Sequence, residues 1–190
     1  MAQLPKGSLK LAHILDELKL DPQGFECADL GCNVGGFTRE LLARGAQRVH
    51  AIDTGYGALE WDLRQDPRVN VKERHNALHA EWLPPQDLVV SDLAWTKQIF
   101  VLGAALKYLK PTGILISLLK PQYEFPAPKG KKAAILSPEF CHEIAHKVLA
   151  EVRSLNSTPF NLHESPIRGG QNCKGNTEYW LVFRPSKVSE

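Results

Sequence analysis

The sequence predicts an α/β fold built on a mostly parallel sheet of seven strands, and three observations support this prediction. Short apolar runs alternate with runs of helical spacing along most of the chain, which is the rhythm of β-α-β units. The last two apolar runs are joined by a loop too short for a crossover helix, so we expect a final antiparallel strand. A length of 190 residues suits one domain with a sizeable core.

The elements can be assigned in order. A leading helix is expected within residues 1–22, because Ser8 is a good N-cap and the leucines that follow it have helical spacing. Seven strands are then expected at FECADLG, RVHAID, VNVKER, DLVVSDLA, GILISLLK, TPFNLHES and TEYWLVFRP. Helices are expected between them at GFTRELLARG, ALEWDLRQ, TKQIFVLGAALKYLK and from Glu139 to about Leu155. Helices on both faces of the sheet would make residues 1–190 a single domain with its core at 25–184.

Composition excludes several classes of protein. With 43% hydrophobic and 23% charged residues the chain is neither disordered nor fibrous. No apolar run reaches the ~18 residues of a membrane helix, and the start lacks the apolar core of a signal peptide, so we expect a cytoplasmic protein with no membrane contact. Four scattered cysteines without a C-x-x-C pair predict reduced thiols. Residues 97–190 carry 13 Lys/Arg against 7 Asp/Glu, which is typical either of chance or of an edge that faces a polyanion.

The segment ADLGCNVGGFT, residues 28–38, indicates a nucleotide-type site. An apolar strand ends there in a glycine-containing turn that begins a helix, and glycines allow the backbone to approach a ligand closely. The next strand ends in Asp53, an acid suited to accept hydrogen bonds from both ribose hydroxyls. Asn33 replaces the second glycine of a dinucleotide loop, and Asp29 before the turn would repel a pyrophosphate.

A cationic nucleoside fits this arrangement, and S-adenosylmethionine is such a cofactor. Asn76 follows the third strand and is expected either to meet the adenine or to act as an ordinary capping residue. The candidate cofactor-binding residues are Asp29, Gly31, Cys32, Asn33, Gly35, Gly36, Phe37, Asp53, Asn76 and Asp92.

Longer segments resemble a known family. DLGCNVGGFT, AIDTGYGALEWDLRQDPRV, SDLA, LLKPQYE and SPIRGGQNCKGNTEYWLVF are similar to the methyltransferase domain of the haemolysin A (TlyA) type, which belongs with the FtsJ/RrmJ-type RNA ribose 2′-O-methyltransferases. The resemblance implies a Rossmann-like class I methyltransferase fold, S-adenosylmethionine as cofactor and an RNA substrate, ribosomal RNA first. It also implies a catalytic tetrad, Lys10, Asp92, Lys120 and Glu178.

The tetrad implies a mechanism. A ribose hydroxyl has a pKa far above neutrality, so its attack needs a base or a nearby positive charge. Lys120, oriented by Asp92, would be that base or charge stabiliser, while Lys10 and Glu178 position the nucleotide. The family's small N-terminal RNA-binding module is not expected in this chain, and LAWTKQ and FPAPKGKKAAILSPEF depart from the family pattern. A partner protein or an oligomer would then bring the RNA to the site.

Two alternatives come from other classes. His142 and His146 form an H-E-x-x-H string with Glu164 as a possible third zinc ligand. Helical spacing instead predicts a buried face of Phe140, Ile144, Val148, Val152 and Leu155, with both histidines on the solvent side, so no metal site is expected. The second alternative is a non-catalytic protein that binds S-adenosylmethionine for interaction, or a membrane-active haemolysin, although no exposed amphipathic stretch supports membrane activity.

Overall fold

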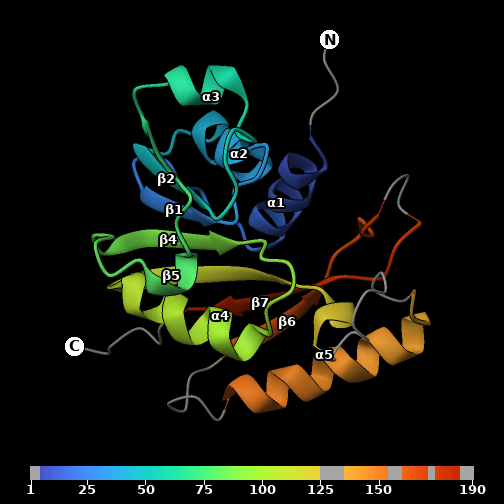
Figure 1. Cartoon of the computed structure of the whole chain (residues 1–190). Coiled ribbons are helices and arrows are strands. Elements are labelled where there is room, and N and C mark those ends of the chain that lie inside the picture. Colours follow the sequence, from blue (N-terminus) through green and yellow to red (C-terminus); the bar gives the residue numbers. More distant parts are fainter. Residues whose placement is uncertain (1–4, 125–134, 154–159, 171–173, 185–190) are drawn as a thin grey trace.

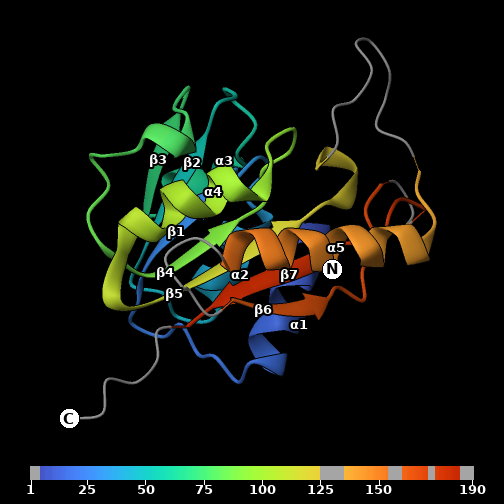
Figure 2. The same cartoon turned by 90° about the horizontal axis from the view of Figure 1, so that it is seen from below.

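A computed structural model describes residues 5–124, 135–153, 160–170 and 174–184. Seven strands form one sheet in the order β3-β2-β1-β4-β5-β7-β6 (Figures 1 and 2). β7 runs antiparallel to both of its neighbours and all other pairs are parallel, which confirms the predicted sheet. The strands are β1 (Glu26–Leu30), β2 (Arg48–Asp53), β3 (Val69–Glu73), β4 (Gln86–Ser91), β5 (Leu109–Leu119), β6 (Phe160–Glu164) and β7 (Tyr179–Phe183).

Helices cover both faces of the sheet, as Figure 1 shows. One face carries α1 (Lys6–Glu17), α2 (Gly36–Ala43) and α3 (Trp61–Gln65), and the other carries α4 (Gln98–Ala105) and α5 (Pro138–Arg153). Three short 3₁₀ helices join them, η1 (Ala77–His79), η2 (Leu106–Tyr108) and η3 (Pro121–Tyr123).

Strand β5 shows how the sheet divides two apolar clusters. Leu115 and Leu119 belong to the cluster under α4 and α5, whereas Ile116 and Leu118 belong to the cluster under α1 and α2. This is the period of two expected for a strand that is buried on both faces. All four side chains are fully buried. The sheet therefore provides a rigid frame for groups at its edge.

Two local predictions are wrong. Helix α1 begins at Lys6 with Pro5 as its N-cap, so Ser8 lies inside the first turn. Its hydroxyl instead donates a hydrogen bond of 2.8 Å to the carbonyl oxygen of Gly36, because α1 and α2 pack closely there. Phe140 is 41% exposed, and the adjacent Cys141 takes its place on the buried face of α5. Leu155 lies outside the described residues.

The strand order creates a crevice. From β1 the chain moves outward to β3 and then returns to β4 on the other side of β1. Ligands of open α/β sheets bind at the carboxyl ends of the strands at such a switch point. Among the described helices, none is long and apolar enough to cross a membrane.

Candidate functional site

The turn after β1 is held by a buried carboxylate. Oδ2 of Asp29 accepts hydrogen bonds from the backbone N–H of Thr38, at 2.9 Å, and from its hydroxyl, at 2.8 Å. The other oxygen, Oδ1, is buried and has no hydrogen-bond partner in the described part of the chain. Burial raises the pKa of Asp29 to about 7, although the two bonds from Thr38 oppose this rise. The free oxygen is therefore ready to accept a hydrogen bond from a cationic ligand.

A second carboxylate stands at the end of β2. Oδ2 of Asp53 accepts a hydrogen bond of 2.8 Å from the backbone N–H of Asn33, and Oδ1 accepts one of 2.7 Å from Gly55. Asn33 adopts a left-handed backbone conformation, φ 46°, which brings the turn after β1 next to β2. The two turns thus fix the direction of the Asp53 carboxylate, as a site for a pair of hydroxyls requires.

The glycines of the turn serve the protein's own packing. A Cβ at Gly36 would lie 2.9 Å from Cα of Gly7, so glycine at this position lets α1 contact α2. Gly35 has φ 98°, and a Cβ there would overlap the side chains of Leu59 and Leu63. Gly35 and Gly36 are therefore needed for packing between elements of the protein itself. The strand-turn-helix pattern predicted only a close approach of a ligand.

Two adjoining cavities surround these turns. The larger has a volume of about 410 Å³ and is lined by residues from the ends of β1, β2, β4 and β5, Asp53, Asn76, Asp92, Trp95 and Lys120 among them. The smaller, about 220 Å³, lies between the start of α1 and the turn after β1, with Asp29 and Phe37 in its wall. Gly31, Asn33 and Asp92 line both cavities. Every predicted cofactor-binding residue except Gly35 therefore lines this composite space.

Three predicted cofactor residues also have structural contacts. The ring of Phe37 packs against Trp180 in the core, with centroids 5.7 Å apart. Cys32 is buried, and burial raises the pKa of its thiol, so the thiol adds no charge to the lining of the smaller cavity. The side-chain oxygen of Asn76 accepts a hydrogen bond of 3.0 Å from Leu78 and caps η1, although Asn76 also lines the larger cavity. The capping role and the ligand-facing position therefore coexist at Asn76.

Two ion pairs between lysine and carboxylate lie together at the sheet edge. Lys120, directly after β5, pairs with Asp92, directly after β4. Lys10 of α1 pairs with Glu178, directly before β7, and both of these side chains are buried. The pairs come from four separate elements and influence each other, since Glu178 acts electrostatically on Lys120. The structure thus brings the four predicted catalytic residues together.

Charge at this cluster follows from burial and pairing. Burial alone would lower the pKa of Lys120, but Asp92, with a smaller effect of Glu178, outweighs burial and raises it. Burial raises the pKa of Glu178, and Lys10 counters only part of that rise. At neutral pH Lys120 is therefore an ammonium group.

An aromatic pair at the cavity mouth is absent from the sequence predictions. Trp95 is 67% exposed, lines the larger cavity and packs on Tyr123 with ring centroids 4.8 Å apart. Its backbone is left-handed, φ 62°, a rare conformation for a large side chain. The segment LAWTKQ departs from the family pattern, and this was the one sign in the sequence that Trp95 is unusual. Its left-handed backbone angle cannot be read from the sequence.

The histidine pair lies outside this site. His142 and His146 are exposed on α5, with ring centroids 4.3 Å apart, as helical spacing predicted. The described residues contain no group of three or more His, Cys, Asp or Glu side chains that could hold a metal ion.

Comparisons with known proteins agree with this geometry. The FtsJ-like methyltransferase family model matches residues 4–184. The chain is 35% identical to the 16S/23S rRNA (cytidine-2′-O)-methyltransferase TlyA of Mycobacterium tuberculosis, over 96% of this chain and 69% of that protein. A solved structure from Lactococcus lactis, described as a hemolysin, is 30% identical with a TM-score of 0.85 and covers 96% of this chain and 88% of that one.

A more distant structure shows the fold alone. It comes from Listeria monocytogenes, is described as an S-adenosylmethionine dependent methyltransferase, and has a TM-score of 0.64 at 14% identity over 95% of this chain and 99% of that one. The sheet is thus the Rossmann-like sheet of these methyltransferases. The chain belongs to the FtsJ-like methyltransferase family, whose methyl donor is S-adenosylmethionine.

Proposed function

We propose that this protein methylates the ribose 2′-oxygen of an RNA, and that ribosomal RNA is the first candidate substrate. One observation carries the proposal: an amine, Lys120, paired with Asp92, lines the same cavity as the ribose-type carboxylate Asp53. A nucleophile bound beside Lys120 would thus lie next to a nucleoside cofactor bound at Asp53. The name of the mycobacterial relative, an rRNA 2′-O-methyltransferase, supports the choice of substrate. Residues 25–184 would form the catalytic core, with the leading helix adding Lys10.

The composite cavity fits S-adenosylmethionine. Asp53 holds two carboxylate oxygens in a fixed direction for the ribose hydroxyls. The unpartnered Oδ1 of Asp29 suits the ammonium group of the cofactor's methionine part, because a buried polar atom without a partner is costly until one binds. When bound, the cofactor supplies an activated methyl group.

Lys120 is the proposed base. A neutral amine can accept the hydroxyl proton as the oxygen becomes nucleophilic, and Asp92 orients that amine. Because the pKa of Lys120 is raised, the neutral form is rare at pH 7 but strongly basic once formed. The pair of Lys10 and Glu178 would position the target nucleotide and tune Lys120 electrostatically. Trp95, which lines the larger cavity, offers a face on which the base of that nucleotide can stack.

The test uses the purified protein, labelled S-adenosylmethionine and ribosomal RNA, followed by mapping of alkali-resistant ribose methylation. Label at a 2′-oxygen supports the proposal. Label on a base, or none on any RNA while the cofactor binds normally, contradicts it. The second of these results would favour a non-catalytic protein that binds the cofactor.

A further inference from the structure

A strip of alternating rings and cations leads away from the larger cavity at the outer edge of the sheet. It consists of Tyr56, Lys72, Arg74, His75 and Trp82. The Arg74 guanidinium lies 4.3 Å from the centre of the Tyr56 ring, and the Lys72 ammonium lies 5.3 Å from that of Trp82. His75 meets Trp82 edge to face at 5.8 Å and also lines the cavity. The strip therefore begins in the wall of the proposed active site.

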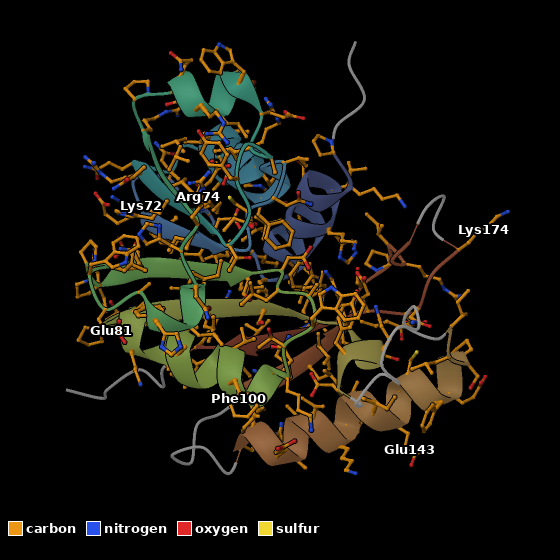
Figure 3. The ribbon with its side chains drawn as sticks, viewed as in Figure 1. Lys72, Arg74, Glu81, Phe100, Glu143 and Lys174 are labelled. Atoms are coloured by element: carbon orange, nitrogen blue, oxygen red, sulfur yellow. The ribbon has the colours of Figure 1, made fainter. Side chains whose placement is uncertain are left out.

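These rings and cations are accessible. Tyr56 is 72% exposed and Trp82 is 41% exposed, unlike the core aromatics. Lys72 and Arg74 are two residues apart at the end of β3, the edge strand of the sheet, and Figure 3 labels both at the end of the molecule opposite Lys174. Lys72 lies in β3 and Arg74 directly after it, and each cation is placed beside a ring by its own contact, Lys72 with Trp82 and Arg74 with Tyr56.

The charge of the strip is not neutralised. The arginines of the neighbouring segments, Arg39, Arg44, Arg64 and Arg68, all form ion pairs with carboxylates. Within residues 5–124 and the other described ranges, Lys72 and Arg74 have no carboxylate within ion-pair distance. Their contacts are with aromatic faces, which leave the positive charge available to a further partner.

The strip is also fixed in place. The backbone N–H of Arg74 donates to the carbonyl of Gly55 at 3.0 Å, and that of Gly57 donates to Glu73 at 2.9 Å. These bonds hold the loop that carries Tyr56 against the end of β3. A rigid surface binds its ligand without the entropic cost of ordering it first.

We propose that this strip binds a single-stranded segment of the RNA next to the nucleotide in the active site. Exposed rings stack on nucleobases of any sequence, and cations between them contact the phosphates, which is the combination that single-stranded nucleic acid requires. A protein partner has no regular alternation of flat bases and phosphates, so it would not account for alternating rings and unpaired cations that begin at the cavity. The inference rests on the proposed function, since it extends the same RNA beyond the active site.

Salt dependence of binding tests the cations. The probe is a fluorescein-labelled single-stranded RNA of mixed sequence, about 12 nucleotides long, and its Kd is measured by anisotropy at several salt concentrations. Each phosphate contact to single strands contributes about 0.7 to the slope of log Kd against log salt, so Lys72→Gln with Arg74→Gln should lower the slope by about 1.4. The matched control, Lys19→Gln with Arg184→Gln, removes the same charge from two exposed residues beside the end of β7, away from β3 in the strand order, and should leave the slope unchanged.

Single-ring variants test the stacking. Tyr56→Ala or Trp82→Ala should weaken RNA binding by about 5-fold to 100-fold, while Tyr56→Phe retains the ring and should bind as the wild type does. Affinity for S-adenosylmethionine checks that each variant is folded. The proposal is overturned if the variants leave the salt slope and the RNA affinity unchanged, or if the protein binds an RNA duplex as tightly as the single strand. If the wild-type protein transfers no methyl group to RNA while the strip variants show the expected changes in RNA binding, the proposed function alone is contradicted.

Discussion

At the scale of single residues, Lys120 separates catalysis from binding. Lys120→Ala should bind S-adenosylmethionine within a few-fold of the wild type, because Asp29 and Asp53 remain. Methyl transfer should fall by a factor of ~100 to 10,000, as expected when one acid-base group is removed. Lys120→Arg should fail nearly as badly, since a guanidinium does not lose its proton. Turnover above about a tenth of the wild-type value in Lys120→Ala would refute this role.

The pH dependence of the rate decides between the two roles open to Lys120. Its raised pKa means that the neutral amine is a small fraction at pH 7 and grows about tenfold per pH unit. A base therefore predicts that log kcat rises with a slope near one between about pH 6.5 and 9. A charge stabiliser predicts a flat profile over the same range. We expect the rise, measured with saturating RNA and cofactor.

Some residue-level features could be predicted from the sequence and others could not. Strand ends on one side of a parallel sheet must meet, so Asp53, Asp92 and Lys120 could be placed from the strand pattern. The family resemblance supplied the whole catalytic tetrad, in which Lys10 and Glu178 come from elements far apart in the chain. The contact of Ser8 with Gly36 and the backbone angle of Trp95 depend on tertiary packing, which no local pattern encodes.

At the scale of elements, the contact of α1 with α2 sets the position of Lys10. Gly36→Ala would place a methyl group 2.9 Å from Cα of Gly7, and separating the helices should cost about 1–3 kcal/mol of unfolding free energy. Gly103→Ala is the matched control. Gly103 is also helical, but a Cβ there has no neighbour within 4 Å, so alanine should stabilise the protein by up to about 1 kcal/mol. Chemical denaturation measures both, and equal stability of the two variants would contradict the close contact.

The sequence pattern predicts the strands well, because they are buried on both faces of the sheet, and predicts the ends of the helices less well. The seven strands and the antiparallel β7 follow from apolar runs and connection lengths. Helix α3 is shorter than ALEWDLRQ suggested, and β5 begins at Leu109, inside the run assigned to the preceding helix. Apolar residues such as Leu109 suit a helix and a strand equally, so strand pairing rather than propensity decided the boundary.

At the scale of the whole molecule, Asp29 couples the cofactor site to the stability of the fold. Its pKa is about 7 in the folded protein against 3.8 ordinarily, because its carboxyl is buried. Between these values the folded chain holds a proton that the unfolded chain has lost. Rising pH therefore favours unfolding, and the contribution of Asp29 falls by about 4 kcal/mol from pH 4 to pH 8.

The variant Asp29→Asn isolates this effect, because asparagine keeps an accepting oxygen for Thr38 but cannot ionise. Buried His50, whose pKa is lowered by burial, acts in the opposite direction as pH falls, and the difference between wild type and variant cancels it. We expect that difference in unfolding free energy to change steadily between pH 4 and 7 and to level off above. Saturating S-adenosylmethionine should flatten it, since a cation beside Oδ1 favours the ionised carboxylate. A difference that does not vary with pH would mean that the protonation state of Asp29 does not change between pH 4 and 8, and would contradict the raised pKa of this buried carboxyl.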